Sequence, residues 1–535
     1  MSRETIEESI LELVAKHVEE SLLSILQVRG SISRDDVQRV KLDAARKFKL
    51  SYTPSNADLL QYIDSQEVRD VLLMKPVRSI SGIVILAVMT APFECPHGRC
   101  IYCPHFPGAP ISYTGREPSA MRGINFQFDP YKQIESRIRQ LEAMGHYTDK
   151  VDIVIQGGTF NQAPEWYRES YMKRLFEFFI GESPTKFPDD LVKAERSRYR
   201  IVGLAFETKP DASKEEDIDW MLEHGGTRVE LGVQTLYDDV YKFVNRGHNL
   251  NDVIEATTLL KDAGFKVTYH LMPGLPLTSI KEDLQVFDKV FNSSNYLPDH
   301  LKIYPTLVLE HTGLIKLWER GEYKPLETDD ALNLVMVAKS TFIPPWNRIM
   351  RVNRDIPSTE VVAGVKKPNL RQLVHQAMDG HGLRCRCIRC REVGHNLVKK
   401  GIDAIEPVVM MRMYNANDGI EFFISVEDPY NDLILGFIRL RKPSPKAWRP
   451  EIVSSETFLV RELHVYGRSL PIGSSEPAYS WQHRGIGSLL LSKAEEIASS
   501  MGGEKIVVIS GVGVREYYYR LGYHRDGPYV SKFIQ

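Results

Sequence analysis

The most constraining feature of this sequence is a regular alternation between short apolar stretches and helix-like stretches. The apolar stretches occupy residues 83–89, 151–155, 201–206, 228–233, 266–271 and 300–304. Alternating βα units imply a parallel sheet covered by helices, and six such units suit a partial or complete barrel. We therefore predict a partial TIM-like (βα)6 barrel across residues 76–343, within an α/β multidomain chain.

The regions on either side of this barrel follow other patterns. Residues 1–75 have apolar positions at helical spacing and a basic stretch at 33–50, which predicts a small helical module. Residues 344–406 lose the alternation and gain proline, arginine and three cysteines, which indicates a metal-binding connector. Residues 407–535 open with four strands of period two, at 408–414, 420–426, 433–440 and 458–465, and these predict an antiparallel sheet.

The six cysteines of the 535 residues fall into two triplets, Cys95, Cys100 and Cys103, and Cys385, Cys387 and Cys390. Six cysteines are too few for a disulfide framework, so two metal sites are expected. The net charge of −2 is ordinary for a globular protein. No apolar run approaches the roughly 20 residues that cross a bilayer, and the acidic N-terminus is no secretory signal. We expect a cytoplasmic protein without a membrane span.

The first triplet directly follows the first barrel strand, at the end where such barrels hold their active sites. Thiolates favour iron-sulfur clusters or zinc. Three thiolates on a four-iron cluster leave one iron open for a cofactor. The alternative is a structural zinc completed by His97 or His105.

Further strand ends carry polar or glycine-rich residues. Gly157, Gly158 and Thr159 follow the second strand, where glycines let the backbone approach a small polar ligand. Glu207 ends the third strand with a carboxylate suited to ribose hydroxyls, and Gln234 ends the fourth. Together these loops predict a cofactor site at one edge of the sheet.

The C-terminal region contains a glycine-rich turn before an amphipathic helix at 489–498. The turn consists of Gln482, His483, Arg484, Gly485, Ile486, Gly487 and Ser488. Free N–H groups and the helix dipole at such a turn suit a pyrophosphate. After an antiparallel strand, this motif resembles the acetyl-CoA loop of GNAT acetyltransferases. The resemblance implies that a tyrosine on the last helix acts as general acid toward the CoA thiolate.

The second triplet is too tightly spaced for a disulfide framework and suits a structural zinc ion. The fourth ligand is expected to be His381 first, with His375 and His395 as further candidates. The arginines between the cysteines, with other basic residues of the same connector, predict a surface for phosphates.

Taken together, these motifs resemble two known families. Cys95, Cys100 and Cys103 with the Gly-Gly-Thr step resemble the radical S-adenosylmethionine (SAM) superfamily, although the first gap is one residue longer than in most members. The motifs at 112–118, 245–248, 302–307 and 511–518 resemble the catalytic subunit of Elongator and its stand-alone prokaryotic relatives. This likeness covers nearly the whole chain.

The resemblance implies a chemistry and a set of site residues. A [4Fe-4S] cluster would bind SAM, and a SAM-derived radical would activate the methyl group of acetyl-CoA for carboxymethylation of C5 of the wobble uridine in tRNA. Tyr517 and Tyr518 match the family's catalytic pair, and Tyr518 is favoured over a packing role. Lys150 matches a residue that contacts acetyl-CoA. The strand residues implied to contact pantetheine are Glu462, Leu463, His464 and Val465.

The expected partners are tRNA, bound in part by the N-terminal module, and acetyl-CoA. An electron donor and a second copy of the chain remain open as partners. Two other functions remain. One is a protein lysine acetyltransferase whose barrel is only structural, and the other is a nucleic-acid-binding module with vestigial catalytic domains.

Overall fold

The computed structural model describes residues 3–74, 79, 81–394, 396, 405–467 and 485–534. Two residues expected at sites, Gln482 and His395, lie outside these ranges. The chain forms two compact units. The first contains Met1–Val84, Glu135–Lys150 and Ser469–Ser474, and the second contains Ile85–Ile134, Val151–Arg468 and Ser475–Gln535.

The first unit begins with the predicted helical module. Its helices are α1 (Arg3–Arg29), α2 (Arg34–Lys47), α3 (Asn56–Leu60) and α4 (Gln66–Leu72). Ser33 and Ser55 cap α2 and α3, each in a capping box with an aspartate three residues later. Val14, Val18 and Leu22 of α1 are fully buried in the core of this module. No helix among the described residues is long and apolar enough to span a bilayer.

The second unit contains the predicted barrel sheet. Its seven strands are, in spatial order, β1 (Val84–Met89), β2 (Lys150–Gln156), β3 (Arg200–Thr208), β4 (Arg228–Gln234), β5 (Lys266–Leu271), β6 (His300–Ile303) and β8 (Arg348–Val352). The pairs from β3 to β8 are parallel. The first six strands match the predicted ones. The prediction of six strands is corrected by β8, which belongs to the barrel although the sequence assigned it to the connector. Charged Arg348 and Arg351 obscure this strand in the sequence.

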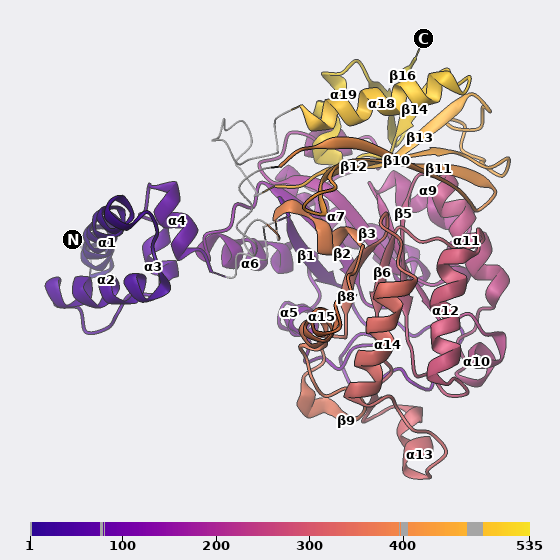
Figure 1. The fold of residues 1–535 in the computed structure, drawn as a ribbon, viewed down its shortest axis with the longest axis horizontal. Coiled ribbons are helices and arrows are strands. Elements are labelled where there is room, and N and C mark those ends of the chain that lie inside the picture. Colours follow the sequence, from indigo (N-terminus) through magenta and orange to yellow (C-terminus); the bar gives the residue numbers. More distant parts are fainter. Residues whose placement is uncertain are drawn as a thin grey trace. The chain divides into compact units, whose positions relative to one another are not determined.

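Helices and short elements of the second unit accompany this sheet, coloured from purple through magenta to orange in Figure 1. The helices are α5 (Pro118–Asn125), α7 (Glu165–Ile180), α8 (Leu191–Ala194), α9 (Glu215–Glu223), α10 (Asp238–Phe243), α11 (Leu250–Asp262), α12 (Ile280–Asn292), α13 (Gly313–Glu319), α14 (Thr328–Thr341), α15 (Leu370–Gly380) and α16 (Ile388–Arg391). Helix α6 (Pro130–Ala143) belongs mostly to the first unit. Strands β7 (Val308–Leu309) and β9 (Val361–Ala363) form a small antiparallel pair. Three 3-10 turns complete the set, η2 (Phe160–Gln162), η3 (Pro210–Ala212) and η4 (Ser358–Glu360).

A second seven-stranded sheet follows in the order β10-β11-β12-β13-β14-β16-β15. Its strands are β10 (Val408–Ala416), β11 (Gly419–Asp428), β12 (Leu433–Lys442), β13 (Thr457–Val465), β14 (Lys505–Val508), β15 (His524–Asp526) and β16 (Tyr529–Phe533). The first four are the predicted antiparallel strands. The sheet lies between the barrel and helix α18 (Ile486–Ser500), and η5 (Val512–Val514) leads into the short helix α19 (Arg515–Tyr519) (Figure 1).

The face of this sheet toward the barrel is charged and buried. The guanidinium of Arg441 donates to Asp262 at 2.7 Å and to Glu421 at 3.0 Å. The guanidinium of Arg461 donates to Asp299 at 2.6 Å and to Glu421 at 2.9 Å. Both arginine side chains are completely inaccessible to solvent. This ion network joins the C-terminal sheet to the end of the barrel where β5 and β6 begin.

Candidate functional site

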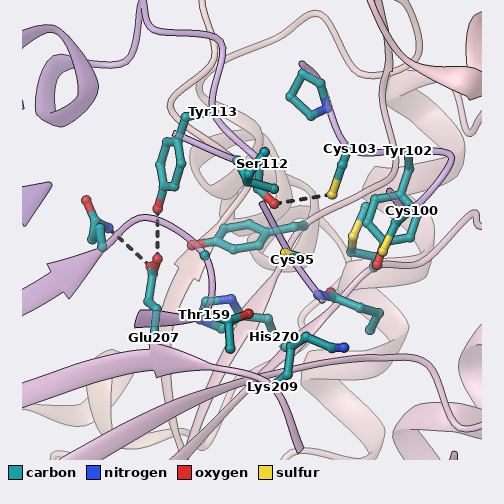
Figure 2. Close-up of a pocket in the computed structure, with 18 of the residues that line it drawn as sticks. Cys95, Cys100, Tyr102, Cys103, Ser112, Tyr113, Thr159, Glu207, Lys209 and His270 are labelled. Carbon is teal, nitrogen blue, oxygen red and sulfur yellow. Dashed lines mark hydrogen bonds between the residues drawn. The ribbon is translucent and has the colours of Figure 1, made fainter. Parts of the chain in front are cut away.

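A pocket lies at the carboxyl ends of the barrel strands, and the first cysteine triplet lines it (Figure 2). Cys100 is buried, while Cys95 and Cys103 are partly exposed. The Sγ of Cys103 lies 3.2 Å from the hydroxyl of Ser112. The three thiols therefore face one cavity at the end of the barrel that the sequence predicted.

Cations gather around Cys100. His97 Nε2 lies 3.4 Å from the sulfur, and the guanidinium of Arg246 lies 3.8 Å from it. Lys209 Nζ contacts His97 Nδ1 at 2.9 Å. A hydrogen bond from the Cys103 thiol, reinforced by His97 and Arg246, lowers the pKa of Cys100 to about 3. Cys100 is therefore favoured as the thiolate, which is the form that ligates metals.

The opposite wall carries the polar residues of the strand ends. The hydroxyl of Tyr113 donates to Glu207 at 2.9 Å, and the amide of Gln156 donates to the other oxygen of Glu207 at 3.3 Å. Gly158 and Thr159 line the same pocket. Glu207 is thus held as an acceptor at the cavity wall, with Tyr113 directly above it in Figure 2.

Gly157 lies beside rather than in this pocket, in a small neighbouring recess with Thr159 and Cys95. Its φ of +137° lies in a region that side chains rarely adopt. A Cβ at this position would also overlap the side chain of Thr90. Gly157 is therefore required for the backbone course of the loop.

The floor of the pocket contains a charged group from three strands. Glu230, fully buried, accepts from His270 Nε2 at 3.1 Å and contacts the ammonium of Lys302. Ligand atoms of Glu207, Glu230 and His270 lie within 4.8 Å of one another. Lys302 already supplies a cation to this group, so we assign it no metal. Gln234, next in the wall, has φ +73° and a buried side-chain oxygen without a partner among the described residues.

The second triplet forms a compact cluster. The sulfurs of Cys385, Cys387 and Cys390 lie within 4.8 Å of one another, which suits a single metal ion. The expected fourth ligand, His381, is not brought to this cluster. Its side chain is exposed and its Nδ1 bonds the carbonyl of Ala377 at 2.8 Å. His381 follows α15, and its backbone is tied to the end of that helix.

His375 lies closest to this cluster among the described histidines that were expected as ligands. Its Nε2 is 3.9 Å from the sulfur of Cys390 and 3.1 Å from Lys339 Nζ. His375 lies on α15 (Leu370–Gly380), one and a half turns before His381. A helix turns residues six positions apart toward different sides, which is why choosing between these histidines needs the structure.

The glycine-rich turn opens helix α18 as predicted. Gly485 is the N-cap residue with φ +79°, and no side chain of the described residues caps the helix. The first N–H groups of such a helix have no partner within the helix itself. A Cβ on Gly487 would lie 2.7 Å from the hydroxyl oxygen of Tyr517, so this glycine permits the close approach of the tyrosine. Ile486 is buried and Ser488 is exposed.

The two catalytic candidates on α19 have different surroundings. The hydroxyl of Tyr517 is buried and has no hydrogen-bond partner among the described residues. The ring of Tyr518 is buried between those of Tyr517 and Tyr523, at centroid distances of 5.3 and 5.8 Å. Burial raises the pKa of Tyr518. Tyr517 therefore presents its hydroxyl to the turn, whereas Tyr518 packs in an aromatic cluster.

The strand predicted to contact pantetheine also has a distinctive geometry. β13 pairs in parallel with β14 from Thr457 to Val460, which lies opposite Val508, and the strand itself extends to Val465. The carboxylate of Glu462 accepts from Arg439 at 2.8 Å and lies 3.6 Å from His300, on the barrel side of the sheet. The Glu462 side chain is therefore occupied by these contacts.

Lys150 starts β2 and belongs to the first unit. Burial lowers the pKa of its ammonium group. Its expected contact with acetyl-CoA stays a prediction, as do the roles of the other site residues.

Sequence reasoning missed the cations beside the first triplet. Lys209 and Arg246 lie far from Cys100 in the sequence, and only the closing of the barrel brings them together. Arg351 and Arg354, which the sequence predicted as part of a basic surface for phosphates, also line this pocket. The guanidinium of Arg354 lies over the ring of Tyr113 at 5.8 Å. The sequence did not predict that these arginines and the first triplet share one pocket.

Comparisons with known proteins show what the chain is similar to. Family models match at residues 3–80 (ELP3 N-terminal domain), 92–289 (Radical SAM superfamily) and 298–379 (Radical SAM C-terminal domain). The tRNA uridine(34) acetyltransferase of Methanocaldococcus jannaschii is 45% identical, and the match covers 94% of this chain and 95% of that protein. Elongator complex protein 3 of Schizosaccharomyces pombe is 42% identical, covering 98% and 99%.

A solved structure is also similar. The archaeal Methanocaldococcus infernus Elp3 with an N-terminal deletion matches with a TM-score of 0.76 and 43% sequence identity. The match covers 85% of this chain and 100% of that chain. Similarity therefore extends over the barrel, the connector and the C-terminal sheet.

Proposed function

The chain belongs to the Elongator complex protein 3 family, and from this we propose that it modifies the wobble uridine, uridine(34), of tRNA with SAM and acetyl-CoA as cosubstrates. The observation that carries the proposal is the presence of two built sites in one chain. One is the three-thiol pocket of the barrel, and the other is the uncapped glycine turn with a buried tyrosine hydroxyl.

The residues of the barrel pocket fit a [4Fe-4S] cluster. Three thiols converge there, and Arg246 and Lys209 place positive charge beside Cys100, which offsets the negative charge of a thiolate-bound cluster. When bound, the cluster with SAM supplies a 5′-deoxyadenosyl radical, and that chemistry belongs to the cofactor. The protein holds the cluster through Cys95, Cys100 and Cys103 and shields it from water.

The opposite wall fits the rest of the cosubstrate. Glu207, fixed by Tyr113 and Gln156, is placed to accept hydrogen bonds from ribose hydroxyls. Gly158 and Thr159 offer backbone and hydroxyl groups to a small polar ligand. Gln234 presents an amide oxygen without a partner among the described residues, so it has capacity to accept from a bound amine.

The C-terminal residues fit acetyl-CoA. The N–H groups at Ile486, Gly487 and Ser488 are placed to donate to a pyrophosphate at the start of α18. Glu462, Leu463, His464 and Val465 at the end of β13 stay the proposed pantetheine contacts. Tyr517 is the general acid, because its hydroxyl is buried against that turn and can donate to a departing thiolate.

We propose that the product is a carboxymethyl group at C5 of the uridine. The acetyl methyl carbon bonds to C5 after giving one hydrogen atom to 5′-deoxyadenosine, and C5 loses its hydrogen as a proton with return of the electron spent on SAM cleavage. Water then hydrolyses the thioester, which leaves the carboxylate and releases CoA. Arg351 and Arg354 at the open side of the pocket are suited to phosphates beside the target base. The basic stretch at 33–50, which contains helix α2, is a further proposed tRNA-binding surface. An electron donor and a second copy of the chain stay predictions.

We also propose a structural zinc ion at Cys385, Cys387 and Cys390, with His375 in place of His381 as the fourth ligand. Metal analysis of the purified protein checks this. We expect one zinc per chain, loss of the zinc in Cys387→Ser and His375→Ala, and retention in His381→Ala. Equal loss in both histidine variants contradicts the assignment to His375.

The main test is anaerobic incubation of the reconstituted protein with unmodified tRNA, SAM, a reductant and methyl-deuterated acetyl-CoA, followed by mass spectrometry of the nucleosides. We expect labelled carboxymethyluridine and deuterium in 5′-deoxyadenosine. The matched controls are Cys100→Ser, which lacks a cluster ligand, and Tyr517→Phe, which lacks the acid. Unmodified tRNA despite SAM cleavage contradicts the proposal.

The competing function is a protein lysine acetyltransferase with a structural barrel. The family membership and the barrel pocket with its three cysteines do not favour this function. The same reaction with a lysine-rich peptide instead of tRNA separates the two, because a lysine acetyltransferase acetylates the peptide with or without SAM.

A further inference from the structure

The segment that carries Tyr517 is pressed against the start of barrel strand β3. A Cβ on Gly513 would lie 2.6 Å from the backbone nitrogen of Ile201 and 2.8 Å from the Cα of Arg200. A Cβ on Gly511 would lie 2.7 Å from the carbonyl oxygen of Ile201. These neighbours are backbone atoms of a paired strand, which cannot move aside. Glycine is therefore required at both positions for η5 to contact the barrel.

A buried ion pair fixes the next turn of the same segment. Arg515 is 1% exposed, and its guanidinium donates to the carboxylate of Glu195 at 3.2 Å and to the carbonyl of Pro528 at 2.8 Å. The hydroxyl of Tyr519 also donates to Glu195, at 3.3 Å. Glu195 follows α8 of the barrel region, so residues on both sides of Tyr517 are held by the same barrel carboxylate.

The helix itself is too short to fix a side chain. α19 contains only five residues, Arg515–Tyr519, and an isolated helix of that length is unstable in water. The direction of Tyr517 must therefore come from contacts of its neighbours. Glu195 and β3 of the barrel supply several of those contacts, while the Tyr517 hydroxyl lies against Gly487 of α18 in the C-terminal domain.

We infer that Glu195 and Arg515, with Gly511 and Gly513, are positioning residues that aim the Tyr517 hydroxyl at the acyl-CoA turn. The acyl-CoA chemistry of the C-terminal domain then depends on the barrel, even where the cluster is not used. This inference rests on the proposed function for the role of Tyr517 as acid. The position of the hydroxyl itself does not depend on that function.

The first experiment measures acetyl-CoA turnover of the full chain in the presence of tRNA. Glu195→Gln keeps the side-chain shape but removes the charge that holds Arg515. We expect kcat to fall about tenfold, with KM for acetyl-CoA changed less than twofold. Combined with Tyr517→Phe, Glu195→Gln is expected to add no further loss, because the group that it positions is absent. Additive losses, or a parallel fall of SAM cleavage, overturn the inference.

Arg196→Gln is the matched control. Arg196 is adjacent to Glu195 and pairs with Glu516 of α19 at 2.7 Å, but its side chain is 83% exposed. Exposed pairs contribute little, so we expect less than a twofold change in kcat. Gly513→Ala tests the close contact of this glycine with β3. If Gly513→Ala does not fold, Glu195→Gln still tests the inference.

A second readout requires no activity. Nitration of Tyr517 by tetranitromethane, located by fragmentation of the 516–520 tryptic peptide, reports the burial of its ring and hydroxyl. We expect nitration to accelerate at least threefold in Glu195→Gln and to stay unchanged in Arg196→Gln. Unchanged nitration in Glu195→Gln overturns the inference. If the unchanged protein shows no acetyl-CoA turnover but Tyr517 is nitrated faster in Glu195→Gln, the positioning role is supported and the proposed function is rejected.

Discussion

Replacing Arg461 with methionine should strongly destabilise the second unit. The Arg461 guanidinium makes its bonds without solvent contact, to both oxygens of Asp299 at 2.6 and 2.8 Å, to Glu421 at 2.9 Å and to the carbonyl of Phe265 at 2.8 Å. Methionine leaves two buried carboxylates to share the remaining arginines. Removing one partner of a buried pair costs about 3–5 kcal/mol, which lowers the melting temperature by roughly 3–6 °C in a unit of this size.

The pH dependence tests the cause of this loss. Although burial raises it, the charges of Arg461 and Arg439 hold the pKa of Asp299 below its ordinary value. A depressed carboxyl pKa contributes stability above the unfolded value of about 4, and this contribution is lost as the pH falls through the folded value. In Arg461→Met, protonation neutralises Asp299 and Glu421, the carboxylates that have lost Arg461. The difference in melting temperature between the variant and the unchanged protein should therefore narrow between pH 7 and pH 5.

The assay is differential scanning fluorimetry of both proteins across that pH range. Arg196→Met, which removes an exposed pair, should show no measurable change in melting temperature. Adding Asp299→Asn and Glu421→Gln to Arg461→Met should restore part of the loss, because no buried charge is then left unpaired. A deficit below 1 °C, or one that does not vary with pH, refutes the role given to this ion network.

Gly487→Ala should lower acetyl-CoA turnover at least tenfold, because the methyl group would lie 2.7 Å from the Tyr517 hydroxyl, whereas Ser488→Ala beside it should change turnover little; steady-state kinetics check this. Burial lowers the pKa of His224, His270 and His300, so these imidazoles stay neutral while the unfolded chain takes up protons below about pH 6.5. Denaturation midpoints should therefore rise from pH 5 to pH 7, and a flat profile contradicts the neutral assignment. Cys100→Ser should abolish SAM cleavage while leaving the dissociation constant for acetyl-CoA within twofold by calorimetry. Tyr517→Phe should leave SAM cleavage intact while lowering acetyl-CoA turnover.

Much of the architecture follows from hydrophobic periodicity. The six predicted barrel strands and the four period-two strands are present, because each buries an apolar face whose spacing is visible in the sequence. Arg439 and Arg441 of β12 show where this reasoning stops. Their alternation with apolar residues is typical of a strand with one solvated face, but the barrel covers that face and supplies Asp262 and Asp299. Long-range charge pairing leaves no local pattern.

The candidate sites divide in the same way. Motif spacing located the cysteine triplets, Gly485 and the tyrosines, because each depends on residues close together in the chain. The choice between His381 and His375 could not be made from the sequence, since both lie near the same cysteines and only the direction of α15 separates them. The choice between neighbouring tyrosines likewise depends on which side of a five-residue helix meets Gly487.

The two sites are attached to opposite ends of one strand. β3 begins at Arg200, where Gly511 and Gly513 hold the tyrosine segment, and its carboxyl end carries Glu207 in the cluster pocket. Ile201 and Glu207 are six residues apart, which corresponds to about 20 Å along an extended strand. Under the proposed function, an acetyl group in the pocket would therefore lie far from the Tyr517 hydroxyl. The C-terminal domain would then act before or after the barrel reaction, and its acyl-CoA chemistry would be separable from SAM cleavage.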